Sequence, residues 1–201
     1  MTPTALFQLL LGLAAAVPLL LMAAESPLRS QCGTGEIRQE GACVLSLAGT
    51  QVVVSSAGSG SLNSLTVRVV GTSANVSEEV DGVAYRAQIA DLDSDQRPEV
   101  YVAIASAGSG SYGSLVAYVV NDDLTLERIV LPELGEDQAV SDGYMGHDDF
   151  AVEETSLVRR FPLYLPGDVN AQPSGGTRNV VYQLEKSGGQ WRLTRTRISD
   201  Y

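Results

Sequence analysis

Hydroxyl and aromatic side chains gather in one glycine-rich stretch of the chain, Ser106 to Ser114 (SAGSGSYGS). Glycine and serine cannot build a hydrophobic core, yet this stretch lies between two strand-like runs, Val100 to Ala105 and Leu115 to Val120. The flanks therefore predict a β-hairpin that presents a donor-rich loop with one aromatic residue, Tyr112, at its tip. Such a loop offers hydroxyl groups for hydrogen bonding, and its glycines allow a partner to approach the backbone closely.

A second copy of this phrase lies fifty positions earlier. Ser56 to Val70 (SAGSGSLNSLTVRVV) aligns with Ser106 to Val120 (SAGSGSYGSLVAYVV), and ten of the fifteen positions are identical. Because two copies are too few for a solenoid, we interpret the repeat as two hairpins of one β-domain. The first copy has Leu62 where the second has Tyr112. We therefore expect one loop to act on a partner and the other to be scaffold; two plain glycine-rich turns are the alternative.

Carboxylates form another candidate cluster in the stretch Asp91 to Glu99 (DLDSDQRPE). Its acidic residues occupy positions 1, 3, 5 and 9 of a short loop that leads into a strand, and Ca²⁺ prefers several such oxygen ligands. The loop resembles the calcium loops of integrin-type repeat blades and of EF-hands, but Gln96 replaces the turn glycine and Val102 replaces the bidentate glutamate. We expect an acidic turn with weak calcium binding or none. The candidate ligands are Asp91, Asp93, Asp95 and Glu99.

The single histidine, His147, precedes Asp148 and Asp149. An imidazole beside two carboxylates could act as a general base or hold half of a metal site. A Ser-His-Asp hydrolase also needs an activated nucleophile, and no Gly-x-Ser-x-Gly elbow between a strand and a helix is evident. We interpret His147 as part of a turn, and we predict that the protein is not an enzyme and uses no cofactor.

The first 24 residues differ in character from the rest of the chain. Met1 to Ala24 carries no charged side chain, and its apolar run from Leu9 to Leu21 is followed by small residues. This pattern predicts a secretory signal peptide, although no basic residue precedes the apolar run; an uncleaved anchor is the alternative. The rest of the chain keeps the whole formal net charge of −11. That charge disfavours nucleic-acid binding and suits a cationic partner, although acidity also serves solubility.

Cys32 and Cys43 are the two cysteines. In an oxidising compartment a pair this close in sequence favours a disulfide that closes a small loop, because two thiols without a nearby histidine are too few for a metal site. We expect three segments: the signal peptide at 1–24, an N-terminal segment with the disulfide loop at 25–50, and a single β-domain at 51–201.

The elements that must position these residues are short strands. From Val44 to Arg197 the chain is a succession of short runs rich in Val, Leu, Ile and Tyr, separated by Gly, Asn, Asp, Ser and Pro. This spacing predicts an all-β fold, a single antiparallel β-sandwich or flattened barrel with short helical turns near Pro132 to Val140. Trp191 opens the last run and is expected to be buried.

Several phrases of the sequence, taken together, carry a family resemblance. The tip Ser109-Gly110-Ser111-Tyr112 resembles the inserting Ser-Gly-x-Tyr loop of periplasmic bacterial inhibitors of invertebrate-type lysozymes. The resemblance covers about Val52 to Trp191 and is strongest from Asp91 onward. The other phrases that carry it are YMGHD (144–148), LVRRFPLY (157–164), PGDVN (166–170) and SGGTR (174–178).

This resemblance implies a secreted periplasmic lysozyme inhibitor that serves evasion of host defence. It implies that the residues of the tip bind lysozyme, with Ser109 and Tyr112 as inhibitory residues and Ser111 at the variable position. Glycosidases of this kind work with paired carboxyl groups, to which both hydroxyls are suited to hydrogen-bond. The alternative function is an exported calcium-dependent β-domain that binds a carbohydrate or a surface protein. No contact with nucleic acid is expected, and none with membrane after signal removal; monomer and homodimer both stay open.

Overall fold

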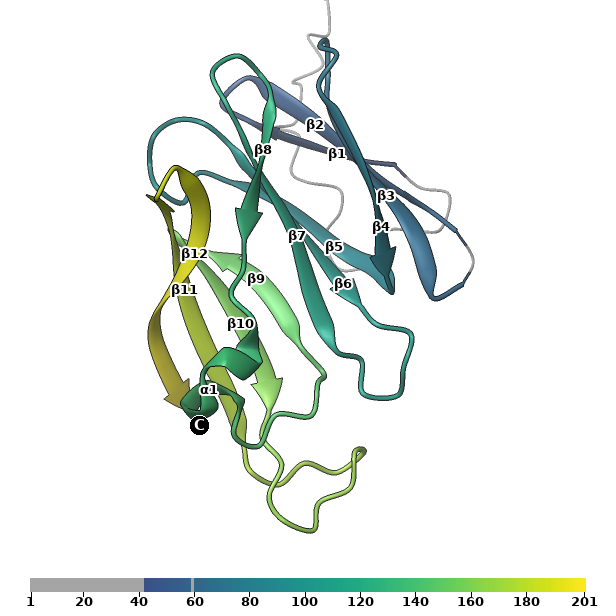
Figure 1. The fold of residues 1–201 in the computed structure, drawn as a ribbon, viewed down its shortest axis with the longest axis vertical. Helices are drawn as coiled ribbons and strands as arrows, with labels where there is room; N and C mark the ends of the chain where they lie inside the picture. The colour runs from purple at the N-terminus through teal and green to yellow at the C-terminus, as the bar shows by residue number, and fades with distance from the viewer. Residues whose placement is uncertain (1–41, 59) are drawn as a thin grey trace, which may run out of the picture.

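A computed structural model describes residues 42–58 and 60–201, which form twelve strands in two sheets (Figure 1). The fold is all-β, as predicted from the spacing of the apolar runs. The first sheet is an antiparallel meander in the order β1-β2-β3-β4. Its strands are β1 (Ala42–Leu47), β2 (Thr50–Ala57), β3 (Leu62–Val69) and β4 (Asn75–Asp81).

The second sheet has eight strands and curls toward a barrel. Their order is β5-β6-β7-β8-β12-β11-β10-β9, and every neighbouring pair is antiparallel except β8 and β12, which run parallel over a two-residue register. The strands are β5 (Val83–Ala90), β6 (Glu99–Ala105), β7 (Gly113–Val120), β8 (Leu126–Val130), β9 (Asp149–Glu153), β10 (Ser156–Pro162), β11 (Thr177–Ser187) and β12 (Gln190–Asp200). A short 3₁₀ helix η1 (Leu134–Glu136) and helix α1 (Gln138–Ser141) follow β8, in agreement with the predicted helical turns.

The strands β6 and β7 belong to two hydrophobic cores. Because successive side chains of a strand point to opposite faces, Val100, Val102 and Ile104 pack against the first sheet, and Tyr101 and Ala103 face the inside of the second sheet. This double burial explains why both runs are almost continuously apolar. The two strands that carry the tip of the β6–β7 hairpin are therefore packed on both faces, and this makes them a rigid base for the tip.

Side chains of β5 close the gap between the two ends of the curled sheet. The Arg86 guanidinium donates to the carbonyl of Phe150 at 2.5 Å, and the Gln88 side chain accepts from the Val152 N–H at 3.0 Å. The Tyr85 hydroxyl accepts from the Phe150 N–H at 3.3 Å. We call these contacts the seam. Among residues 42–58 and 60–201 no strand pairs with the outer edge of β9, and these side chains hydrogen-bond its backbone groups instead.

Two strands, β4 and β9, lie outside the runs rich in Val, Leu, Ile and Tyr on which the prediction of strands was based. Both carry several acidic residues, and this lowers their strand-like appearance. Strand β1 pairs with β2 although it lies before residue 51, where the β-domain was predicted to begin. Trp191 is buried, as predicted.

Parts of the predicted organisation fall outside the described residues. The signal peptide at 1–24 and Cys32 are among them, so the disulfide stays a prediction, with Cys43 buried in β1 between the sheets. Within residues 42–58 and 60–201, no helix is long and apolar enough to cross a membrane.

Candidate functional site

The tip of the β6–β7 hairpin is a closed loop with an exposed surface. The Ser106 N–H donates to the Tyr112 carbonyl at 2.9 Å, and the Ser111 N–H donates to the Gly108 carbonyl at 3.0 Å. Ser111 adopts a left-handed backbone with φ 43°. Ser109 is exposed and the Tyr112 residue is 50% exposed. Their hydroxyl groups make no hydrogen bond within the described part of the chain, so they are available to a partner.

Two other loops hold this tip in place. The His147 N–H donates to the Gly110 carbonyl at 2.8 Å, and the Asn170 side-chain amide donates to the Ser109 carbonyl at 2.7 Å. The side chains of His147 and Asn170 also meet each other at 3.2 Å. The tip 106–112, the loop 142–148 and the loop 163–176 thus form one composite region, which we call the three-loop surface.

Ring packing and close backbone contact lock the three-loop surface further. The Tyr112 ring lies edge-on to Tyr144, with 5.7 Å between centroids and 74° between planes. Gly110 lies under the Tyr112 ring, and Gly146, with φ 93°, lies against the Gly110 carbonyl. A Cβ atom at Gly146 would collide with the Gly110 carbonyl, so this approach requires glycine at position 146, whereas a Cβ atom at Gly110 would displace the half-exposed Tyr112 ring.

A buried ion pair lies beneath the tip. The Arg159 Nε atom donates to Asp148 at 2.6 Å, and the Asp148 side chain is fully buried. The other carboxylate oxygen accepts from the Gly113 N–H at 2.6 Å and from the Tyr144 hydroxyl at 2.5 Å. The carboxylate therefore ties the first residue of β7 to β10 and to the loop 142–148.

The groups around this ion pair satisfy one another. Arg159 Nη2 donates to the Tyr144 hydroxyl at 2.9 Å, and the guanidinium also lies over the Phe150 ring at 5.1 Å. Burial raises the pKa of the Tyr144 phenol above its ordinary value, so the hydroxyl stays a donor to Asp148 even in alkaline solution. A Cβ atom at Gly113 would collide with the Asp148 side chain, so the carboxylate occupies the space that a side chain at position 113 would need.

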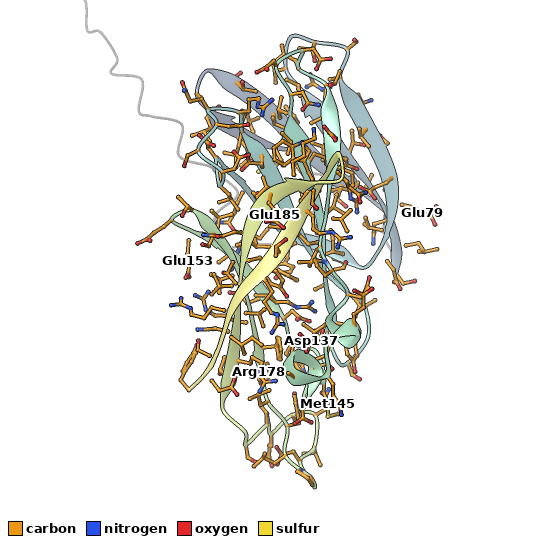
Figure 2. The ribbon with its side chains drawn as sticks, turned by 60° about the vertical axis from the view of Figure 1, so that its left-hand side comes forward. Glu79, Asp137, Met145, Glu153, Arg178 and Glu185 are labelled. Carbon is orange, nitrogen blue, oxygen red and sulfur yellow. The ribbon has the colours of Figure 1, made fainter. Side chains whose placement is uncertain are left out.

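The start of the loop 142–148 is fixed by Arg178 of β11. Its guanidinium donates to the carbonyls of Val140 at 2.9 Å and Asp142 at 3.2 Å, and it pairs with Asp200 at 2.7 Å. Figure 2 shows Arg178 beside the short helix, at the end of the molecule where Met145 also lies. Met145 is exposed, as are Leu165 and Val169 of the neighbouring loop. The three-loop surface therefore combines apolar side chains with the hydroxyl groups of the tip.

A cleft of about 700 Å³ lies next to Tyr112. Its walls come from β4, the start of β7 and the segment that runs from β8 to α1. Three exposed acidic side chains line it, Glu79, Asp81 and Glu133. Glu79, labelled in Figure 2, and Asp81 belong to β4 of the first sheet, and Glu133 belongs to the segment after β8, so the cleft brings acidic groups from these two places next to Tyr112.

The tip of the β2–β3 hairpin is built differently. Leu62 is 58% exposed, and the neighbouring Asn63 side chain is buried, donating to the carbonyls of Gly60 at 2.9 Å and Gly82 at 2.7 Å. Asn63 corresponds to Gly113 of the second copy. The first tip is thus held by its own Asn63 side chain and by Gly82 of the adjacent β4–β5 turn, whose N–H donates to the Ser61 carbonyl at 2.6 Å, whereas the second is held by loops far away in the sequence.

The acidic loop between β5 and β6 brings its four carboxylates together. One oxygen from each of Asp91, Asp93, Asp95 and Glu99 lies within 4.8 Å of the others. Asx-type hydrogen bonds hold this turn, since Asp93 accepts from the Asp95 N–H at 3.3 Å and Asp95 accepts from the Arg97 N–H at 2.8 Å. Burial, reinforced by the neighbouring aspartates, raises the pKa of Glu99 to about 8.

The structure places the predicted residues in two separate regions. Ser109, Gly110, Ser111 and Tyr112 lie on the three-loop surface together with His147, which sits in a turn with φ 60° and bonds the Gly110 carbonyl. The acidic loop lies at the opposite end of β6. Sequence reasoning missed Asn170 as a support of the tip and Asp148 as a buried anchor. Both lie in phrases singled out above, but nothing local indicates their long-range contacts.

Comparison with known proteins returns no significant match to a protein family, to a curated protein or to a solved structure.

Proposed function

We propose that this protein inhibits a lysozyme by inserting the β6–β7 tip into the substrate cleft of the enzyme, and that the enzyme is an invertebrate-type lysozyme. The observation that carries the proposal is that the tip is exposed at Ser109 and Tyr112 and yet is fixed by His147 and Asn170. A loop already held in one conformation loses less conformational entropy on binding than a free loop. A fixed, protruding loop is therefore suited to enter a cleft.

The chemistry of the tip fits a glycosidase cleft. Retaining and inverting glycosidases work with two carboxyl groups that flank the scissile bond. The hydroxyl groups of Ser109 and Tyr112 have no partner among the described residues and can donate to such carboxylates. The half-exposed Tyr112 ring supplies apolar contact area, which is the property of aromatic residues at the centre of tight interfaces.

Charge supports the choice of a cationic partner. The chain has a formal net charge of −11, and Glu79, Asp81 and Glu133 line the cleft beside the tip. Lysozymes that act on anionic cell walls are often cationic, and opposite charges speed association and orient the two proteins. Acidity near the tip would therefore steer the enzyme toward the inserting loop.

A panel of enzymes tests the proposal. Purified mature protein is assayed against lysozymes of the invertebrate, chicken and goose types, with and without a calcium chelator. We expect inhibition of the invertebrate type that rises with inhibitor concentration, weakens with added salt, and is unchanged by the chelator. No inhibition of any of the three enzymes would reject the proposal. Binding to a glycan or surface protein that the chelator abolishes would favour the calcium-dependent alternative.

A further inference from the structure

We propose that the β5–β6 connection is a calcium site, with Asp91, Asp93, Asp95 and Glu99 as its carboxylate ligands. The inference is independent of lysozyme inhibition, because the site lies at the opposite end of β6 from the inserting tip (Figure 1). A strand of this length separates the two by about 20 Å, at about 3.3 Å per residue. An ion here would act on the fold rather than on the partner.

The position of Glu99 is the observation that points to a ligand. This first residue of β6 is only 1% exposed, and its carboxylate lies among the three aspartates. Its Oε2 atom accepts from the Leu92 N–H at 2.8 Å, but its Oε1 atom has no hydrogen-bond partner within the described part of the chain. A buried acceptor without a donor is rare in native proteins. A bound cation would supply the missing partner.

The charges of the site are also uncompensated. Asp95 pairs with Arg97, which also reaches Asp122 at 3.6 Å. In contrast, Asp91, Asp93 and Glu99 have no ion-pair partner among residues 42–58 and 60–201. Three carboxylates that share one small space repel one another, and Glu99 is removed from water as well. A divalent cation neutralises this repulsion with a single ion.

The size of the cluster fits Ca²⁺. Calcium binds oxygen ligands at about 2.3–2.6 Å, so two ligands on opposite sides of the ion are about 4.6–5.2 Å apart. The four carboxylate oxygens lie within 4.8 Å of one another. Four carboxylate ligands leave two or more positions for backbone carbonyls or water, which complete the six to eight oxygens that calcium takes.

The two departures from known calcium loops, at Gln96 and at Val102, do not prevent this assignment. The expectation of weak or absent binding rested on Gln96, which stands where such loops have glycine, but Gln96 adopts the left-handed backbone with φ 71°. Glu99 reaches the cluster from position 9, although position 12 carries Val102. The site therefore forms from the residues present.

Thermal unfolding with added ions tests the site directly. After treatment with a chelator, the full-length mature protein is melted with Ca²⁺, with Mg²⁺, or with neither. Calcium at about 100 times its Kd should raise the Tm by about 5–10 °C. Mg²⁺ at the same concentration should have a much smaller effect, because it demands a tighter octahedral shell. No calcium response at millimolar concentration, or an equal response to Mg²⁺, would overturn the proposal.

Variants locate the binding to the four carboxylates. Glu99→Gln keeps an acceptor for the Leu92 N–H while removing the charge, and it should abolish the calcium-induced rise in Tm. Asp93→Asn should lower calcium affinity at least tenfold, and it decides the question should Glu99→Gln fail to fold. Glu79→Gln makes the same charge change on an exposed strand and should respond like wild type. Wild-type calcium affinity in Asp93→Asn and Glu99→Gln would place the ion elsewhere and contradict the assignment.

Terbium gives a second readout that a change in stability cannot mimic. The Tyr101 hydroxyl lies 3.4 Å from Glu99 Oε2, close enough for the ring to sensitise a Tb³⁺ ion bound at the site. Excitation of tyrosine should produce Tb³⁺ emission, and this emission should decrease as added Ca²⁺ displaces the bound Tb³⁺. Replacing Tyr101 by phenylalanine should lower that emission while leaving the calcium-induced rise in Tm. Tb³⁺ emission that does not decrease when Ca²⁺ is added would count against the site.

Discussion

The two hairpins of the internal repeat have the same glycine and serine tip but different supports. The β2–β3 tip is held by Asn63, a side chain of its own hairpin that bonds Gly60 and Gly82. The β6–β7 tip has Gly113 at the corresponding position, and Asp148 of a distant loop bonds its N–H. One substitution thus separates a tip held by its own Asn63 side chain and the adjacent β4–β5 turn from a tip held by loops far away in the sequence.

The difference teaches how a repeated scaffold can acquire a loop suited to the binding role that we propose. Removing the side chain at position 113 makes room for Asp148 and for the loop that carries His147. The loop fixes the backbone of the tip from outside, so the tip's own hydroxyl groups stay free for a partner. At the first tip the residue that corresponds to Tyr112 is the exposed Leu62, which offers no hydroxyl group.

The largest expected effect comes from breaking the outside support. Asp148→Ala leaves the buried Arg159 without its carboxylate, and we expect the free energy of unfolding to fall by about 3–5 kcal/mol. Asp81→Ala removes an exposed carboxylate beside the first tip and should change it by less than about 0.5 kcal/mol. Urea unfolding of both variants gives the comparison. Equal stability of the two would show that Asp148 is no anchor.

The predicted disulfide gives the corresponding stability test for the first sheet, because Cys43 belongs to β1. Cys32→Ser should lower the free energy of unfolding by about 2–3 kcal/mol on the chain-entropy model, and inhibition measured well below the Tm should be unchanged. Mass spectrometry of exported protein should show that the two thiols of Cys32 and Cys43 are oxidised. Two free thiols in that material would contradict the prediction.

Side-chain truncation at the tips separates the two hairpins by function. Tyr112→Ala and Ser109→Ala should weaken inhibition strongly, by about 2 kcal/mol or roughly thirtyfold for the tyrosine. The fold should be intact by circular dichroism, because neither side chain is buried. Leu62→Ala is the matched change in the first copy and should leave inhibition nearly unchanged. Equal inhibition by wild type, Tyr112→Ala and Ser109→Ala would refute loop insertion.

A smaller effect is expected where only the approach of two loops is disturbed. Gly146→Ala combines a left-handed backbone with a collision at the Gly110 carbonyl, whereas Gly49→Ala has a similar backbone with φ 81° and open space around it. Each should lose about 1–3 kcal/mol of stability from the backbone alone. Only Gly146→Ala should also weaken inhibition, by about tenfold. Inhibition curves that coincide for the two variants would exclude a role for this contact.

The smallest expected effect follows loss of one side-chain amide. Asn170→Ala removes the amide that holds the Ser109 carbonyl and that also contacts the His147 side chain, and we expect inhibition to weaken by about 1 kcal/mol, roughly fivefold. Gln172→Ala truncates an exposed amide of the same loop and serves as control. The expectation fails if both variants inhibit like wild type.

Local patterns predicted much of the architecture. Val-rich runs on both sides of the Gly-Ser stretches indicated the two hairpins, and the alternation around Trp191 indicated its burial. Acidic strands were missed because β4, with two glutamates and an aspartate, resembles a loop by composition. The two-residue parallel pairing of β8 with β12 has no local signal at all, since its partners are more than sixty positions apart.

The support of the site was less predictable than the site. Exposed Ser109 and Tyr112 stood out because their residue types are unusual between two apolar runs. Asp148 did not, because its neighbour Asp149 is chemically identical and only tertiary contacts decide which of them is buried. The contact between Asn170 and Ser109 joins residues sixty-one positions apart, and side-chain amides are common in ordinary turns.

The seam between β5 and β9 bears on how the protein behaves when it is crowded. An outer strand with open N–H and carbonyl groups is a template onto which a second molecule can add a strand and begin aggregation. Such groups on β9 are hydrogen-bonded by the side chains of Tyr85, Arg86 and Gln88. A side chain, unlike a strand, offers no further row of backbone groups with which another strand could pair. The curled sheet is thereby protected at one end against edge-to-edge assembly, without full closure of the barrel by backbone pairing.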